Sequence, residues 1–295
     1  MESGVMRTRT GLEIRVVEDP SPLEAPSSLP ETALCRLRWL GQAGFLIETV
    51  SSRYLVDPYL SDSLAVKYRG APFAHRRMMD VPVDPASLVG VDFCLSTHGH
   101  TDHLDPRTIG PLARADPACR FVAPAACAQV AVSRGVPASR LFPADAFADL
   151  ELGELSVHPI PSAHESLAID GAGHHLFLGY LLSLPGLRIY HAGDCVPYEG
   201  LVGNLASWEV DLALLPINGR DEVRRAAGIP GNFNLAEAIA LAKQARFGCA
   251  IGHHFGMFDF NTVEPETALA KIESERVDNF LIARSGVSYI LSAAH

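Results

Sequence analysis

Short apolar runs alternate with helix-like segments from Cys35 almost to the end of the chain, and this alternation most constrains the fold. The runs have the length of strands, and Gly, Pro or polar clusters separate them. Segment 234–248 shows the helical pattern: Asn234 suits an N-cap, Glu237 follows three residues later, and Gly248 stops the helix. Many strands with interspersed helices in one continuous unit predict an α/β (or α+β) domain of two sheets with helices outside.

Residues 1–34 differ from the rest of the chain in composition. Four prolines stand there among Ser and Glu: Pro20, Pro22, Pro26 and Pro30. We expect this segment to be an N-terminal arm with little regular structure of its own, packed on the body or on a neighbouring copy. Residues 35–295 then form a single domain, and the chain is long enough to bury a sizeable core.

The chain carries 24 Lys and Arg against 34 Asp and Glu, a formal charge of −10. This balance disfavours broad nucleic-acid binding, which draws on many phosphate–cation contacts. No run of roughly 18 apolar residues and no signal-type apolar segment occurs, so we expect no membrane span. The six cysteines are scattered without a CxxC pair and suit reduced thiols, which predicts a cytoplasmic protein.

The stretch STHGHTDHLDP, residues 96–106, holds three of the twelve histidines directly after an apolar run. On an extended strand His98 and His100 point to one side, and the chain then turns, so that Asp102 and His103 face the same cavity from another direction. Imidazole and carboxylate are ligands for zinc and related divalent ions. Two ligand groups displaced along one loop suit two ions, which at roughly 3.5–4 Å apart share and activate a hydroxide.

Other ligand-type residues end apolar runs elsewhere in the chain: His164, Asp194, His254 and Asp57. A single strand-end histidine or aspartate is usually a hydrogen-bonded structural residue. Several in one chain favour a common site, because side chains at the ends of sheet strands converge.

Neighbouring residues of the same types need to be distinguished from these candidates. His253 and His254 are adjacent, and strand alternation lets only one of them face the site; we favour His254. Alternation also places His191 on the opposite side from Asp194, in a structural or supporting role. Cys195 has no base partner in a motif, so we interpret it as a small packed thiol.

The motif HxHxDH at residues 98–103, followed by His164, Asp194 and His254, resembles the metallo-β-lactamase superfamily over about residues 40–295. The resemblance implies a four-layer αβ/βα sandwich with a two-metal site along one edge. Carried over by position, it implies a first metal held by His98, His100 and His164, and a second held by Asp102, His103 and His254. It further implies that Asp194 bridges the two metals and that Asp57 supports the ligand loop.

Four stretches resemble the branch of L-ascorbate-6-phosphate lactonase: WLGQAGFLIE, STHGHTDHLDP, YHAGDCVPYEG and GHHFGMF. The lactonase itself is longer and differs where this chain reads SAHE and LLPINGRD, so the branch does not name the substrate. The branch and the N-terminal arm together suggest a homo-oligomer.

These observations predict a hydrolase that uses a metal-bound hydroxide on a small anionic ester or lactone. Asp102 would orient the hydroxide and accept its proton, with no covalent intermediate. The ligand types suit zinc, manganese or iron, and the resemblance implies two zinc or manganese ions rather than iron. The alternative is a phosphodiesterase, of the nuclease or phospholipase D kind, on the same binuclear site.

Two basic clusters offer binding groups for an anionic substrate, one at residues 67–77 and one at residues 220–225. Arginine forks suit phosphate or carboxylate. We hypothesise that the anionic group contacts Arg76, Arg77, Asn218 and Arg220. A solvated loop or a subunit interface is the alternative explanation of these clusters.

Overall fold

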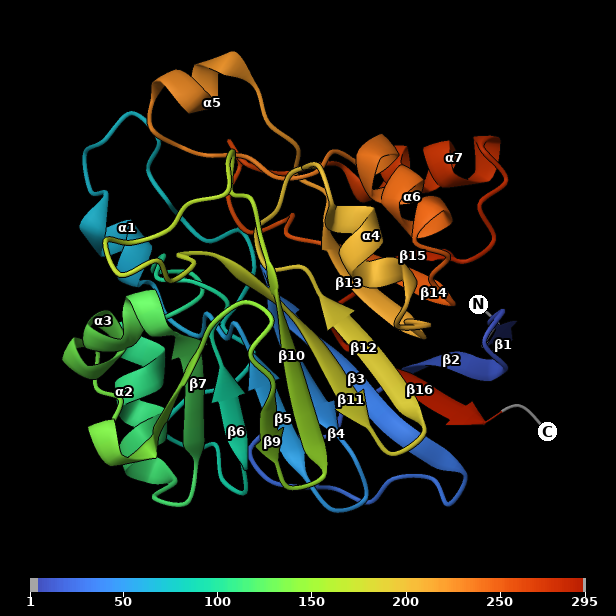
Figure 1. Cartoon of the computed structure of the whole chain (residues 1–295), viewed down its shortest axis with the longest axis horizontal. Helices are drawn as coiled ribbons and strands as arrows, with labels where there is room; N and C mark the ends of the chain where they lie inside the picture. The colour runs from blue at the N-terminus through green and yellow to red at the C-terminus, as the bar shows by residue number, and fades with distance from the viewer. Residues whose placement is uncertain (1–4, 294–295) are drawn as a thin grey trace.

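Two mixed β-sheets pack face to face in the computed structural model, which describes residues 5–293 (Figure 1). The first sheet has nine strands in the order β1-β2-β16-β3-β4-β5-β6-β7-β8. Their bounds are β1 Val5–Arg7, β2 Leu12–Glu18, β3 Ala33–Gly41, β4 Gly44–Glu48, β5 Arg53–Val56, β6 Phe93–Leu95, β7 Arg120–Pro124, β8 Leu141–Ala144 and β16 Val287–Ala293. Strands β5 to β8 run parallel, and the other neighbours in this sheet are antiparallel.

The second sheet has seven strands in the order β15-β14-β13-β12-β11-β10-β9. Their bounds are β9 Leu150–Leu152, β10 Leu155–Pro161, β11 Leu178–Leu184, β12 Leu187–His191, β13 Leu212–Pro216, β14 Cys249–His253 and β15 Phe280–Ile282. Strands β12 to β15 run parallel. Strands β13 and β14 are buried throughout, which explains their unbroken apolar sequence.

Most of the helices within residues 5–293 flank the outer faces of the two sheets, and two short ones lie in loops beyond the sheet edge (Figure 1). Their bounds are α1 Ser63–Lys67, α2 Pro106–Ala115, α3 Ala128–Ser133, α4 Leu201–Ala206, α5 Glu222–Ala226, α6 Leu235–Gln244 and α7 Pro265–Ser274. In Figure 1, α2 and α3 lie beside β6 and β7, whereas α4, α6 and α7 lie beside β12 to β14. This arrangement of two mixed sheets with flanking helices confirms the predicted fold class. None of the helices within residues 5–293 could span a bilayer.

Two helix starts carry the capping residues that helices usually have, at residue 105 and, as the sequence indicated, at residue 234. Asp105 precedes α2 and accepts a hydrogen bond from the Arg107 amide at 3.1 Å, with Pro106 at the first helical position. Asn234 and Glu237 form a reciprocal capping box at the start of α6, with both bonds at 3.0 Å. The helix after residue 105 therefore begins where the ligand loop ends and fixes that end of the loop.

The N-terminal segment contains more regular structure than its prolines indicated. Strand β2 pairs antiparallel with β16 along its length, and β1 pairs with β2. Leu12 and Ile14 alternate with more exposed residues and enter the core, so burial stabilises a strand there despite the short length. The expectation of an arm without regular structure is corrected for residues 5–18. Residues 1–4 lie outside the described part of the chain, as do residues 294 and 295.

An ion cluster on the first sheet holds the next part of this segment in place. The buried carboxylate of Glu48 accepts from Arg36 at 2.9 Å, from Arg38 at 3.0 Å and from Arg53 at 3.1 Å. The same guanidinium groups donate onward to backbone carbonyls of residues 21–27, including 3.0 Å from Arg38 Nη1 to Ser21 O. The arginines thus fasten residues 21–27, which have no regular secondary structure, across the sheet.

A tight turn interrupts the apolar stretch at residues 36–49, whose sequence alone predicts one continuous strand. Strands β3 and β4 form a hairpin around Gln42 and Ala43. Gly41 has φ 93° and Gln42 has φ 50°, the left-handed values that such a turn requires. The turn brings Gln42 to the sheet edge where the ligand-type residues gather.

Candidate metal centre

The carboxyl ends of parallel strands from both sheets meet at one edge of the sandwich. From the first sheet, Asp57 follows β5, and the HxHxDH loop at 98–103 follows β6. From the second sheet, Asp194 follows β12 and His254 follows β14. Converging strand ends are the usual place for sites in such sheets, and the sequence prediction rested on this geometry.

Seven predicted ligand residues come together there in two groups. The first group is His98, His100, His164 and Asp194, and the second is Asp102, His103 and His254. Within each group, one candidate ligand atom per residue lies within 4.8 Å of the others. Both groups combine residues from the two sheets, so neither sheet alone supplies a complete set.

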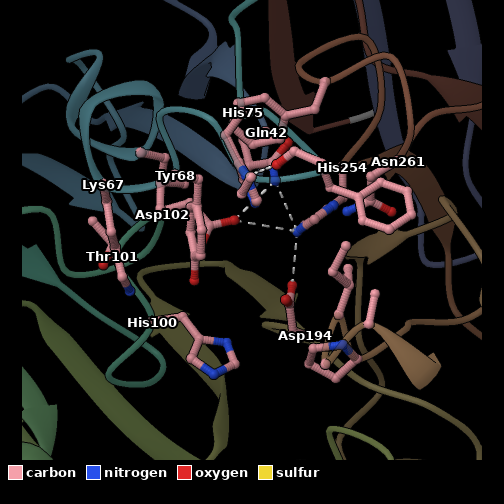
Figure 2. A pocket seen from close by; sticks show the side chains of 18 of the residues that line it. Gln42, Lys67, Tyr68, His75, His100, Thr101, Asp102, Asp194, His254 and Asn261 are labelled. Atoms are coloured by element: carbon pink, nitrogen blue, oxygen red, sulfur yellow. Dashed lines mark hydrogen bonds and ion pairs between the residues drawn. The ribbon is translucent and has the colours of Figure 1, made fainter. Parts of the chain in front are cut away.

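Asp194 lies between the two groups (Figure 2). Its Oδ2 is 3.4 Å from His164 Nε2, in the first group. Its Oδ1 is 3.3 Å from His103 Nε2 and 3.1 Å from His254 Nε2, in the second. Asp194 thus presents one carboxylate oxygen toward each group, so it could contact a cation held by either.

Several atoms at this centre are buried without a hydrogen-bond partner among the described residues. They are His98 Nε2, His103 Nε2 and Asp194 Oδ1; the last two lie 3.3 Å apart as an ion pair but without hydrogen-bond geometry. An unpaired buried polar atom costs about 1–3 kcal/mol, and native proteins contain few of them. Their clustering at a set of imidazole and carboxylate donors is the pattern that bound cations would satisfy, so the residues fit the implied metals.

Asp57 orients the loop from below. It is fully buried, and it accepts from the Thr97 amide at 2.7 Å, from the Thr97 hydroxyl at 2.7 Å and from His103 Nδ1 at 2.8 Å. A proton held on Nδ1 leaves the Nε2 lone pair of His103 directed at the second group. These are the contacts that the predicted supporting role of Asp57 requires.

Electrostatics at the centre favour ionised carboxylates, a neutral ring at His98 and positive charge at His103. Burial lowers the pKa of His98 well below its usual value, which keeps the ring neutral. Burial tends to raise the pKa of Asp194, but His254, His103 and His164 lower it well below the ordinary range. Burial tends to lower the pKa of His103, yet Asp194, Asp57 and Asp102 raise it well above its usual value. The carboxylates therefore create a field that stabilises positive charge at this spot.

Gln42 is a site residue that the sequence analysis missed. It is buried, its Nε2 donates to Asp102 Oδ2 at 2.9 Å, and it lies 3.3 Å from His254 Nε2 (Figure 2). Its backbone carbonyl also accepts from the His254 amide at 3.0 Å. The signal that could have found it is the GQAG sequence, a polar residue between two glycines within an apolar run.

The two adjacent histidines face different parts of the structure. His254 has φ 65° and faces the second ligand group. His253 is buried in the core, where its ring centre lies 5.3 Å from that of Phe45 and 5.2 Å from that of His191. His191 itself contacts Ala43 O at 2.8 Å and accepts from the Gly193 amide at 3.0 Å, a supporting position. Burial raises the pKa of Cys195 to about 11, as expected for a packed thiol.

The structure does not bring the predicted anion-binding arginines to the metal centre. Arg77 donates to the carbonyls of Tyr59 at 3.0 Å, Ser61 at 3.2 Å and Met79 at 3.0 Å, so its donors hold the loop. Arg76 is exposed and lies outside the set of residues that line the cavity at the centre.

The second basic cluster is likewise engaged elsewhere. Arg220 makes two bonds of 2.7 Å to Glu237, a residue of the α6 capping box. Asn218 reaches the cavity only indirectly, because its amide donates to Asn261 at 2.7 Å and Asn261 lines the cavity. The hypothesis for direct contact by these residues is corrected, because internal partners already use their polar groups.

A cavity of about 390 Å³ opens over the two groups. Its floor contains His100, Asp102, Asp194 and His254, and Lys67 lies at its wall (Figure 2). The Lys67 side chain is exposed, and its Nζ is 5.0 Å from the centre of the Tyr68 ring.

Comparisons with known proteins agree with this geometry. The model of the beta-lactamase superfamily domain matches residues 52–255. A UPF0173 metal-dependent hydrolase of Aeropyrum pernix is 28% identical over 87% of this chain and 97% of its own length. N-acyl-phosphatidylethanolamine-hydrolyzing phospholipase D 1 of Caenorhabditis elegans is 23% identical over 81% of this chain and 70% of its own length.

Among solved structures, the isothiocyanate hydrolase from Delia radicum gut bacteria shares the fold, with a TM-score of 0.71 and 17% identity over 88% of this chain and 99% of that one. The matched family model covers most of the chain and includes all seven ligand-type residues. The chain belongs to the beta-lactamase superfamily.

Proposed function

We propose that this protein is a metal-dependent hydrolase that holds two divalent cations and cleaves small esters or lactones. The observation that carries the proposal is the position of Asp194 between two complete ligand groups, with one oxygen toward each. The relatives named as metal-dependent hydrolases support it, and the resemblance to the lactonase branch supports lactones.

Both ligand groups consist of imidazole and carboxylate donors, which suit zinc or manganese. Such ions, when bound, lower the pKa of water to about 7 and polarise a carbonyl oxygen. His98, His100 and His164 would hold one ion, Asp102, His103 and His254 the other, and Asp194 both. The buried cysteines are consistent with a cytoplasmic location, which we propose as well.

Asp102 is the residue that we propose takes the proton of the attacking water. Burial tends to raise the pKa of its carboxyl, but His103 lowers it, and the net pKa lies below the usual value. Asp102 is therefore ionised at neutral pH, and Gln42 fixes one of its oxygens. As the water oxygen bonds to the carbonyl carbon, Asp102 receives the proton; the proton then passes to the leaving oxygen as the C–O bond breaks.

The test begins with elemental analysis of the purified protein, the Asp194→Asn variant and a His174→Ala control. His174 has a side chain that is 44% exposed and belongs to neither ligand group. We expect about two equivalents of zinc or manganese in the wild type and control, and substantial loss in Asp194→Asn. One equivalent or none in a folded, metal-supplemented wild type would refute the binuclear centre.

Activity is then measured with the restored metal on esters, lactones and bis-p-nitrophenyl phosphate. Hydrolysis of esters or lactones that disappears on chelation and returns with metal supports the proposal. Turnover of the phosphodiester alone would favour the second candidate, a phosphodiesterase, which the C. elegans phospholipase D relative suggests. Activity that persists in a metal-free sample would exclude both.

A further inference from the structure

We propose that the cavity over the metal centre selects a substrate with a compact apolar group, an aryl ring or a branched alkyl chain, next to the ester or lactone. The inference rests on the proposed hydrolase function and names the substrate class of that site. It replaces the expectation of an anionic head group held by arginines.

One wall of the cavity is aromatic, and it consists of Tyr68, Phe73, His75 and Phe258. Tyr68 stacks on His75 with ring centres 4.2 Å apart and planes inclined by 20°. His75 and Phe258 make an edge-to-face contact with ring centres 4.9 Å apart. Phe73 packs on Phe260, behind the wall, at 5.2 Å. Stacked and edge-to-face contacts of this kind give a continuous apolar face.

The aromatic wall is held in place by the chain behind it. The Met78 amide donates to Met257 O at 2.9 Å, which ties the loop carrying Phe73 and His75 to the loop carrying Phe258. Asn261 closes that second loop and is held by the Asn218 amide at 2.7 Å. A wall fixed before binding loses little conformational freedom when a ligand packs on it.

The chain segment after α5 also lines the cavity, and it is apolar as well. Ala227, Ile229 and Pro230 contribute methyl, branched alkyl and ring surface there. A substrate group that contacts both this segment and the aromatic wall is shielded from water on two of its sides. The transfer of apolar surface out of water is the main source of affinity in such pockets.

Apart from the metal ions that the site would hold, the lining of the cavity has few cationic groups. Lys67 is the one Lys or Arg among the lining residues that the structure describes, and it is exposed. A single exposed ammonium attracts an anion only weakly, because water screens it. A phosphorylated group normally needs several donors or a bidentate arginine. Away from the metal centre the cavity therefore offers little to hold an additional anionic group.

The size of the cavity limits the apolar group. About 390 Å³ is near the lower end of the range for ligand pockets, roughly 300–1,000 Å³. Part of this volume lies over the metal centre and is needed for the reacting group. A single ring or a short branched chain fits what is left, whereas a long acyl chain would extend into solvent.

The experiment compares three methyl esters that differ only in the acyl group: acetate, phenylacetate and the dianionic phosphonoacetate. With the metal-loaded full chain, we expect kcat/KM for methyl phenylacetate to exceed that for methyl acetate by roughly 10- to 100-fold, the factor that burial of a ring provides. Methyl phosphonoacetate should be the poorest substrate. A dianionic ester as the best substrate, or equal rates for acetate and phenylacetate, would overturn the inference.

Phe73→Ala removes part of the aromatic wall, and Phe147→Ala is the matched control, because Phe147 is 65% exposed and outside the cavity. We expect Phe73→Ala to raise KM for methyl phenylacetate about tenfold and to leave methyl acetate nearly unchanged. The control should resemble the wild type. If the Phe73→Ala variant keeps the preference for methyl phenylacetate, the aromatic wall does not bind the apolar group of the substrate.

Calorimetry with sodium phenylacetate and sodium acetate on the same samples separates this inference from the proposed function. Both anions carry one carboxylate, so the difference between their Kd values measures the contribution of the phenyl ring to binding. Tighter binding of phenylacetate that is lost in Phe73→Ala supports the inference even if no ester is turned over, an outcome that would refute only the hydrolase proposal. Equal Kd values in the wild type would overturn the inference even with active enzyme.

Discussion

Replacement of Asp57 by Asn should weaken metal binding in a protein that still folds. Asp57 accepts three hydrogen bonds in the fully buried layer beneath the ligand loop, two from Thr97 and one from His103. The amide retains one acceptor oxygen and puts an NH₂ group where the other oxygen stood. If the amide oxygen keeps the Thr97 amide, the NH₂ faces the Thr97 hydroxyl and His103 Nδ1, which are both donors in the wild type.

The magnitude follows from these contacts. Two hydrogen bonds to a carboxylate are worth about 1.5–3 kcal/mol each. Rotation of the Thr97 hydroxyl and a change of tautomer in His103 would recover part of this hydrogen-bond energy. We therefore expect the free energy of unfolding of the variant to be about 2–4 kcal/mol lower than that of the wild type. The changed tautomer puts the proton on His103 Nε2, where it opposes a cation. Metal affinity should then fall by roughly 10- to 100-fold, the usual effect of losing such a supporting carboxylate.

The assay is chelator competition for zinc and manganese, combined with ¹⁵N spectra of the histidine rings that report the tautomer. Asp116→Asn is the matched control, because Asp116 is also buried and accepts from backbone amides, at 2.9 Å from Val91 and 3.2 Å from Ala118. The control should lose stability without losing metal affinity. Unchanged metal affinity in a folded Asp57→Asn variant would refute the proposed role of Asp57.

Three further predictions concern other parts of the molecule. Glu48→Gln should lower the free energy of unfolding by about 3–5 kcal/mol, because three buried arginines lose their shared partner; Glu13→Gln, at an exposed pair, should change it by under about 1 kcal/mol in the same urea titration. Burial tends to raise the pKa of Asp19, but serine hydroxyls lower it from 3.8 to about 2, so its carboxylate stabilises the fold above about pH 4 and loses this effect as the pH falls toward 2. The stability gap between wild type and Asp19→Asn should therefore shrink from pH 5 to pH 3, and a gap that widens would contradict the assignment. Gln42→Ala should reduce kcat about 10- to 100-fold with both metals retained, since Asp102 loses its orienting donor; loss of metal in elemental analysis would show a structural role instead.

The ligand set was predictable from sequence for a physical reason. His164, Asp194 and His254 each follow the end of an apolar run, and the position of a strand end in a sheet is fixed by the fold. The hydrophobic pattern therefore indicated a common site with the HxHxDH loop, and the family resemblance supplied the assignment of the individual ligands. Alternation indicated only that one of His253 and His254 faces the site, and the resemblance to the family motif favoured His254, which follows β14 with a positive φ.

The contacts of long cationic side chains were not predictable in the same way. Arg77 and Arg220 have enough reach to find partners in several directions, and their partners are carbonyls and a carboxylate distant in sequence. Nothing in the local sequence reveals such partners. The strands at residues 5–18 were missed because the nearby prolines outweighed two short apolar alternations.

The division of each ligand group between the two sheets has a consequence for folding inside the cell. A cation bound to either group would act as a reversible cross-link between the two sheets of the sandwich. The folded population would then depend on free metal concentration, with a gain of about 2.7 kcal/mol when the metal reaches 100 times its Kd. Metal supply would set how long the protein survives proteolysis as well as whether it is active.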